Sequence, residues 1–189
     1  MQRCALAFLA VSLTLPSIAA ALPIVSVDAD PNLPGVQTTR SVELGDSFDV
    51  AISVEAVDAA HPLHAFELVL AHGDVLGGAS VALGDFLGAD AFLIPGAPSP
   101  IGVEIAAARL GPEGSAGAGV LAIVHFAALA LGTSPLDPLD VLLAEPFGVP
   151  LATDAIHGAT IEVVPEAATG ALLFAALAAL AGARRARRI

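Results

Sequence analysis

The sequence of 189 residues contains no lysine, no tryptophan and no tyrosine, and its single cysteine is Cys4. Sugar rings commonly stack on tryptophan and tyrosine in carbohydrate-binding proteins, so their absence counts against a sugar-binding platform. All 19 acidic residues lie between Asp28 and Glu166. Residues 22–166 contain only Arg40 and Arg109 as basic residues, which gives this span a formal charge of −17.

This charge distribution argues against nucleic-acid binding, because basic patches are needed to neutralise phosphate groups. It favours a soluble domain whose copies repel one another. Two interpretations of the carboxylates stay open, namely solvated acidic faces or sites for cations such as calcium.

The stretch Asp28-Ala29-Asp30-Pro31-Asn32 begins like a calcium-binding loop. An EF-hand loop needs glycine at its sixth position and glutamate at its twelfth. Those positions hold Leu33 and Thr39, so we expect a turn rich in Asx and proline. No other calcium ligand set is legible, and the sequence predicts no cofactor.

The first 21 residues are typical of a secretory signal peptide. Arg3 is their only charge, residues 5–15 are apolar, and Ala19 and Ala21 fit a small-residue cleavage site. Cys4 precedes the apolar region, whereas a lipoprotein cysteine follows it. Cleavage leaves a mature chain without cysteine, which excludes disulfides and thiol chemistry in spite of export.

Residues 167–183 carry no charge. As a helix they span about 26 Å, close to the thickness of the hydrocarbon core of a bilayer. We therefore predict a transmembrane helix with a cytoplasmic C-terminus, because four arginines follow it. The alternative is a buried core helix that ends in a solvated basic tail. The four arginines are Arg184, Arg185, Arg187 and Arg188.

Val164, Pro165 and Glu166 come directly before this uncharged run. Together with the run and the arginines, they make the segment 164–189 resemble the PEP-CTERM sorting signal of bacterial surface proteins. That pattern joins a Val-Pro-Glu-Pro motif to a hydrophobic helix and an Arg-rich end. Ala167 replaces the second proline of the motif. The resemblance implies that the chain is the substrate of an exosortase, a membrane-embedded cysteine protease-transpeptidase. It implies export, anchoring by the C-terminal helix, and then surface display or secretion after processing.

Between these ends, residues 22–163 form one predicted domain. The plainest strand pattern is the alternation of Phe48, Val50, Ile52 and Val54 with smaller or polar residues. Helical periodicity is absent, and about eight or nine short strands indicate an all-β, antiparallel β-sandwich. The predicted strands are Ile24–Asp28, Ser47–Glu55, Leu63–Ala71, Val75–Leu83, Val103–Leu110, Val120–Leu131, Leu139–Ala144 and Ile156–Val163.

Local details of this domain are also predicted. Gly77-Gly78 indicates a bulge, and residues 84–102 a long connection with a short helical turn around residues 85–87. The apolar run Val120–Leu131 predicts a central strand buried on both faces, with His125 as a hydrogen-bonded core residue. Residues 132–138 are predicted to form a turn.

Several segments within residues 42–163 follow one another in a characteristic order and spacing. They are Leu44–Val50, Ala65–Leu70, the strand around Leu76, Gly117–Phe126, Gly132–Leu136, Leu139–Ala144 and Gly158–Val163. In this order and spacing, residues 42–163 resemble a cohesin-type module. The resemblance implies a nine-stranded jelly roll that binds dockerin modules through one sheet face. It transfers no binding residue, because that face follows no fixed motif.

No catalytic constellation is apparent. A zinc site needs three or four ligands, and the five histidines show no such spacing, since Pro62 separates His61 from His64. The nucleophile motif Gly-x-Ser-x-Gly is absent. Pairs such as Asp137 and Asp140 occur by chance among 19 carboxylates, so we predict a protein without enzymatic activity.

The sequence therefore predicts a non-catalytic exported surface protein whose cohesin-like module binds another secreted protein. The resemblance to cohesins implies that this partner carries a dockerin. The alternative is a protein that binds extracellular polysaccharide or the biofilm matrix.

Overall fold

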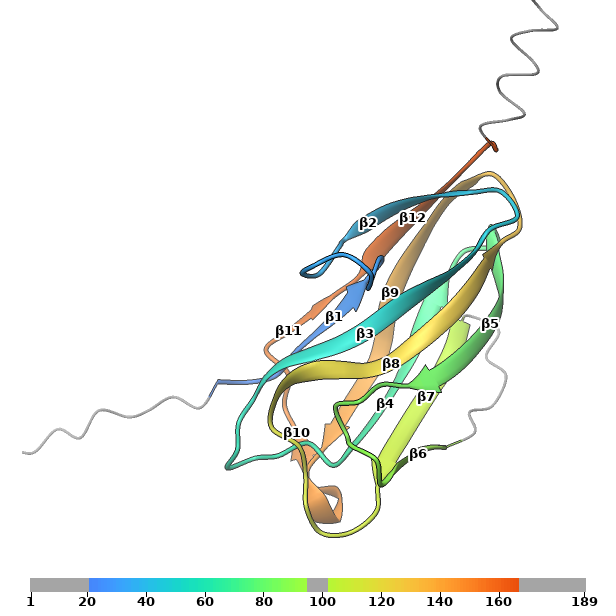
Figure 1. Ribbon diagram of the computed structural model, residues 1–189. Coiled ribbons are helices and arrows are strands. Elements are labelled where there is room, and N and C mark those ends of the chain that lie inside the picture. Colours follow the sequence, from blue (N-terminus) through green and yellow to red (C-terminus); the bar gives the residue numbers. More distant parts are fainter. Residues whose placement is uncertain (1–20, 95–101, 167–189) are drawn as a thin grey trace, which may run out of the picture.

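Two β-sheets pack face to face in the computed structural model, which describes residues 21–94 and 102–166 (Figure 1). Most of the predicted signal peptide, including Ala19, lies outside the described residues, as do the predicted helix 167–183 and the arginines that follow it. Within the described part, no helix is long and apolar enough to cross a bilayer.

Sheet A has the strand order β11-β1-β3-β8-β5. Its central strands are β3 (Ser47–Val57) and β8 (Gly117–Ala128), which pair antiparallel. The flanking strands are β1 (Ile24–Asp28), β11 (Ala155–His157) and β5 (Leu76–Leu83).

Sheet B has the order β2-β12-β9-β4-β7-β6, with β10 paired to one end of β9. Its longest strand, β9, is continuous over 13 residues. A 3₁₀ turn at Pro146–Gly148 links β9 to β10. The strands are β2 (Thr39–Glu43), β4 (Ala65–His72), β6 (Ala91–Ile94), β7 (Gly102–Arg109), β9 (Gly132–Ala144), β10 (Pro150–Leu151) and β12 (Ala159–Val164).

The core lies between the sheets and follows the predicted alternation. Phe48, Val50, Ile52 and Val54 of β3 are all buried, as are the alternate residues of β4 that start at Phe66. The Gly77-Gly78 bulge is also confirmed, because the β5–β8 register shifts between Gly77 and Ser80. The predicted all-β sandwich is therefore correct.

The sandwich is not purely antiparallel. The pairs β1–β11 and β2–β12 are parallel, because the last segment of the chain runs beside the first in both sheets. The single strand predicted at Ile156–Val163 is two strands, and the chain passes from sheet A to sheet B at Gly158. A Cβ there would stand 2.7 Å from the carbonyl oxygen of Leu136, so the crossing requires glycine.

The prediction of a turn at residues 132–138 is wrong, because these residues form the first half of β9. Its prolines suggested a break. Pro135 pairs with β12 and Pro138 pairs with β4, so each proline joins a ladder on one side only and its missing N–H is tolerated.

Other segments differ from the prediction. Residues 84–102 contain the edge strand β6, and residues 85–88 form a hydrogen-bonded turn in place of the predicted helical turn. The strand β2 was not predicted. The described residues thus form twelve strands, more than the eight or nine expected, because several have only two to five residues.

The prediction that β8 is buried on both faces is also wrong. Leu121, Val124 and Phe126 are buried, but His125 is exposed and pairs with the Asp49 carboxylate on the outer face of sheet A. His125 is therefore a surface residue. The cause is that none of the described residues forms a second layer over this part of the outer face of sheet A.

Candidate interaction face

The outer face of sheet B brings together side chains from four strands that are distant in sequence. Strand pairing aligns Ile94 of β6, Ala106 of β7, Glu67 of β4 and Leu142 of β9 in one row. Since side chains alternate along a strand, residues two positions away lie on the same face. This register adds Phe92 of β6 to the face, along with Val69 and Leu139.

Four large apolar side chains on this face remain exposed. Phe92 and Ile94 keep 44% of their surface, Leu139 keeps 40% and Leu142 keeps 62%. Two of them lie on β6 and two on β9, with Ala106 and Glu67 between them in the row. Groups of exposed apolar side chains mark interaction sites in soluble proteins. We call the set Val69, Phe92, Ile94, Leu139 and Leu142 the apolar face.

The charges on and around the apolar face are all negative. Glu67 lies between Ala106 and Leu142, and Glu104 lies opposite Val69. Within residues 21–94 and 102–166, neither glutamate takes part in an ion pair.

The two arginines of the described part are engaged elsewhere. Arg40 donates to the carbonyl oxygens of Ala29 and Asp49 at 3.2 and 3.1 Å, and its guanidinium lies 3.4 Å from the Asp30 carboxylate. Arg109 lies near Glu113, with 4.0 Å between the charged atoms. The apolar face therefore has no cation of its own.

The outer face of sheet A has a different character. It carries Asp49 and His125, and the loop after β1 folds over part of it. The Asp28 carboxylate fixes this loop by accepting hydrogen bonds from the backbone N–H groups of Asp30 and Gln37. The predicted Asx turn is thus confirmed. The hollow beneath the loop, of about 350 Å³, is lined in part by Leu33 and Val36.

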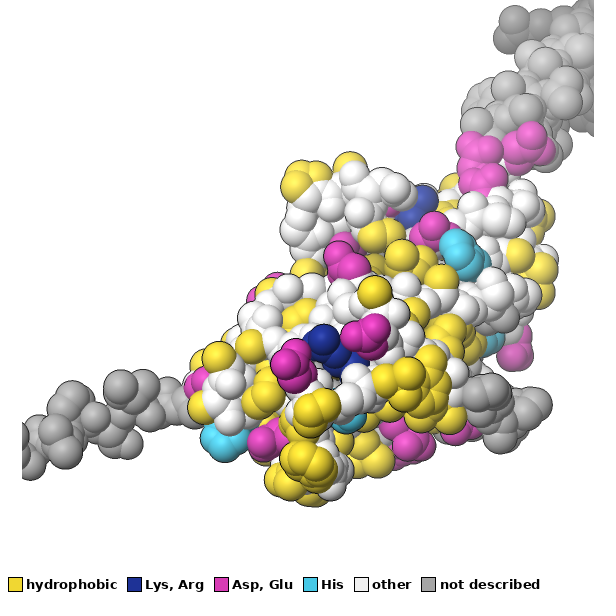
Figure 2. All heavy atoms as spheres, turned by 60° about the horizontal axis from the view of Figure 1, so that its bottom comes forward, with side chains coloured by type: hydrophobic (Ala, Val, Ile, Leu, Met, Phe, Trp, Pro, Cys, Tyr) yellow, Lys and Arg dark blue, Asp and Glu magenta, His cyan; other side chains and the backbone are white. Residues whose placement is uncertain are grey.

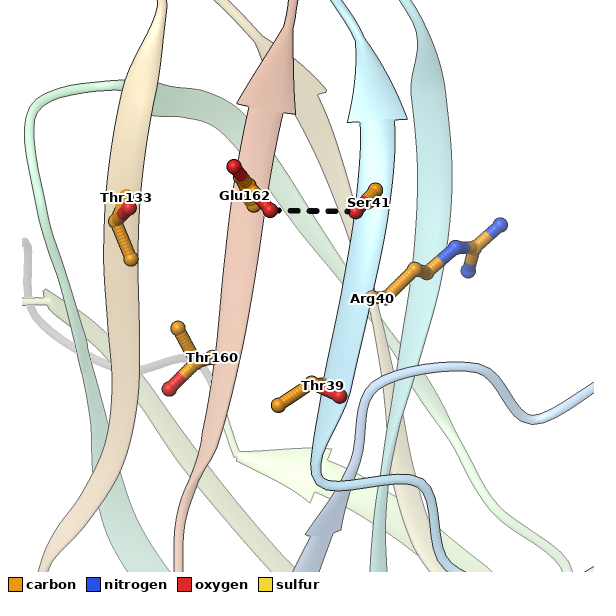
Figure 3. Close-up of a pocket in the computed structure, with 6 residues that line it drawn as sticks. All are labelled: Thr39, Arg40, Ser41, Thr133, Thr160 and Glu162. Atoms are coloured by element: carbon orange, nitrogen blue, oxygen red, sulfur yellow. Dashed lines mark hydrogen bonds between the residues drawn. The ribbon is translucent and has the colours of Figure 1, made fainter.

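The outer face of sheet B also has a polar hollow of about 450 Å³, which lies over β2, β12 and β9 (Figure 3). Four hydroxyl side chains and one carboxylate from β2, β12 and β9 point into it, whereas Arg40 points away. The Ser41 hydroxyl donates to the Glu162 carboxylate at 3.5 Å. We call this set the hydroxyl hollow: Thr39, Ser41, Thr133, Thr160 and Glu162.

The end of the sandwich near the β9–β10 turn also exposes apolar residues. Phe147 is almost fully exposed and adopts a left-handed conformation (φ 67°), unusual for a bulky residue. Leu110 and Val149 are exposed as well. A view towards this end shows hydrophobic side chains along its lower part, with acidic groups nearby (Figure 2).

The predicted sorting motif begins inside the folded domain. Val164 is the last residue of β12, and its carbonyl oxygen accepts a hydrogen bond from the N–H of Leu44 at 2.9 Å. Pro165 and Glu166 are exposed beyond the strand. Ala21, from the predicted cleavage site, is exposed before β1.

The histidines and carboxylates do not assemble into a recognisable centre. His61 pairs with Glu145 at 3.1 Å. No three metal-ligating side chains come together within the described part of the chain. Asp137 and Asp140 are exposed on β9.

Sequence reasoning missed the residues that form the apolar face. Phe92 and Ile94 lie in a segment predicted to be a connection, and the register that joins them to Leu142 is not visible in any motif. The only usable signal was the apolar tetrapeptide Ala91-Phe92-Leu93-Ile94 within a segment rich in glycine and proline.

No protein-family model and no curated protein sequence matches the chain. Among solved structures, a non-cellulosomal cohesin from the archaeon Archaeoglobus fulgidus matches with a TM-score of 0.59 and 15% identity, over 79% of this chain and 96% of its own. The chain has the cohesin fold.

Further cohesins agree with this assignment of the fold. The cohesin module of a family 33 glycoside hydrolase from Clostridium perfringens matches with a TM-score of 0.60 and 12% identity, over 77% of this chain and 99% of its own. A type I cohesin–dockerin complex from Clostridium thermocellum matches with a TM-score of 0.57 and 13% identity, over 76% and 96%. At sequence identities this low, the similarity to these structures establishes the fold alone.

Proposed function

We propose that this cohesin-like protein is a non-catalytic binding module that docks a dockerin-bearing secreted protein on the apolar face of sheet B. The observation that carries the proposal is the uncovered group Phe92, Ile94, Leu139 and Leu142 on one sheet surface. Several solved structures with the same fold are complexes with dockerins, which supports this choice of partner.

The composition of the apolar face indicates what such a partner presents. Each of the four large side chains is about half exposed, so its burial under a partner contributes on the order of 1 kcal/mol. Glu67 and Glu104 require cations opposite them. The partner therefore combines apolar side chains with lysine or arginine, and we expect its affinity to fall as salt is raised.

The test is capture of secreted proteins from the producing organism on the full chain, purified in mild detergent, with calcium or with chelator. The Leu142→Arg variant should lose the captured protein because it places a long cation in the apolar face. Leu129→Arg is the matched control, since Leu129 is 60% exposed but lies outside that face. Mass spectrometry must identify a dockerin module in the captured protein. Recovery of no such protein contradicts the proposal.

We further propose that the protein is exported through its signal peptide, anchored by helix 167–183 and processed by an exosortase at Val164-Pro165-Glu166. The support is the sequence of these segments. Changing Arg184, Arg185, Arg187 and Arg188 together to serine should impair membrane retention, because it removes the positive-inside signal. The measurement is fractionation of cells with surface labelling, and unchanged display contradicts the anchor.

The hydroxyl hollow favours a second candidate function, binding of extracellular polysaccharide. Its hydroxyls and the Glu162 carboxylate match the donors and acceptors of sugar hydroxyl groups. The same bait should then retain the organism's exopolysaccharide, and Glu162→Ala should release it. Retention of polysaccharide without any dockerin-bearing protein would favour this function over docking.

A further inference from the structure

The sandwich has a leucine-bearing end where the chain leaves β12. Strand directions place three turns at this end, at residues 44–46, 73–75 and 129–131, together with Pro165 and Glu166 (Figure 1). We call it the C-terminal pole. The β9–β10 turn lies at the opposite pole, about 40 Å away along β9.

Leucines project from two of these turns into solvent. Leu44 is 43% exposed, Leu129 is 60% exposed and Leu131 is 53% exposed. No lysine or arginine lies in the three turns. The carboxylates beside them are Glu43, Asp46, Asp74 and Glu166.

Backbone hydrogen bonds hold the leucine turns next to the exit of the chain. The N–H of Leu44 donates to the carbonyl oxygen of Val164, and the N–H of Gly45 donates to that of Ala128, each at 2.9 Å. The N–H of Leu129 donates to the carbonyl oxygen of Val75 at 2.8 Å. The three turns and the end of β12 therefore form one rigid surface.

The distance from this surface to the predicted membrane anchor is short. The fold ends at Val164, and the uncharged run begins at Ala167. Only Pro165 and Glu166 lie between them, and two residues span at most about 7 Å. A chain anchored by residues 167–183 has no linker long enough to hold the domain away from the bilayer.

We infer that, as long as the chain keeps its proposed anchor, the C-terminal pole rests on the outer leaflet of the membrane, with Leu44, Leu129 and Leu131 buried at the boundary of headgroups and acyl chains. Apolar side chains on membrane-facing surfaces are buried to this depth. The neighbouring carboxylates keep the contact shallow and match a zwitterionic rather than an anionic lipid surface. The apolar face of sheet B then runs along the membrane normal, open to a partner from the side.

This inference rests on the proposed anchor and is independent of the docking proposal. Because the chain has no tryptophan or tyrosine, one introduced tryptophan reports its own surroundings without background. Leu131→Trp places the reporter at the C-terminal pole. Val149→Trp is the matched control at the opposite pole, since Val149 is 51% exposed.

The full chain carrying either substitution is reconstituted in phosphatidylcholine vesicles, and flotation first establishes insertion. We expect the Leu131→Trp emission to shift to shorter wavelength and to be quenched by lipids brominated near the headgroup. The Val149→Trp emission should match that of a solvent-exposed indole. Equal, solvent-like emission from both variants in floating vesicles overturns the inference, and failure to float overturns the anchor on which it rests. Dockerin capture is measured separately, so its outcome affects neither result.

Discussion

Replacing Val50 by aspartate tests the packing of the core most sharply. Val50 lies in the middle of β3, is fully buried, and pairs with Val124 of β8. The basic group near this part of β3 is Arg40, which donates to the carbonyl oxygen of the neighbouring Asp49. Its guanidinium is already held there and by Ala29 and Asp30, so a carboxylate at position 50 gains no cation of its own. Burying an unpaired charge costs several kcal/mol, so we expect a loss of about 4 kcal/mol in the free energy of unfolding.

That loss is a large part of the 5–15 kcal/mol that stabilises a typical domain. Urea denaturation followed by far-ultraviolet circular dichroism measures it, since the chain has no tryptophan to follow. The loss should shrink at acidic pH, because the neutral carboxyl is cheaper to bury than the carboxylate. Ser47→Asp, at an exposed position of the same strand, is the control and should change little. Equal denaturation midpoints for Val50→Asp and the parent would refute the predicted register.

Two further substitutions test the closure of the sandwich. Gly158→Ala should destabilise the fold by about 2 kcal/mol, because its Cβ would overlap the Leu136 carbonyl, whereas Gly73→Ala should be tolerated since its nearest neighbour is 3.4 Å away. Equal melting of the two variants would contradict the crossing at residue 158. Arg40→Met should cost about 2 kcal/mol, because carbonyl groups including that of Asp49 lose a charged donor. Thermal unfolding measures both effects, and an unchanged melting temperature for Arg40→Met would show that these hydrogen bonds do not stabilise the fold.

Strands with one buried face could be predicted from the sequence. The alternation that starts at Phe48 identifies β3, and the alternation of Phe66, Leu68 and Leu70 identifies β4. In each case the apolar period of two reports a single buried face. The bulge in β5 could be predicted from its glycine pair for a local reason as well, because Gly78 adopts φ 67°, a conformation that glycine allows.

Features set by long-range pairing could not be predicted. The prolines of β9 signalled a turn, but strands far away in sequence pair with them on one side each. The switch of sheets at Gly158 depends on where the first strands lie. The apolar run around His125 indicated a fully buried strand, yet the outer face of β8 is open to solvent at His125.

The apolar face is also a feature set by long-range pairing. Ile94, Glu67 and Leu142 come into one row only through the pairing of β6, β7, β4 and β9. The exposure of Ile94 and Leu142 could not be predicted either, because both lie in apolar stretches of the sequence that give no sign of which side chains face solvent. The resemblance to cohesins indicated a binding sheet but could not select its residues.

The most direct test of the docking account is a titration of the captured dockerin-bearing partner against the full chain and two variants. We expect Leu142→Arg to weaken binding at least about tenfold, a loss of roughly 1.4 kcal/mol, because it places a cation on the β9 side of the apolar face, where the partner's own cations and apolar side chains dock. Leu129→Arg, at a similarly exposed leucine away from that face, should bind like the parent. Unchanged affinity for Leu142→Arg, or an equal loss in both variants, would contradict docking on the outer face of sheet B.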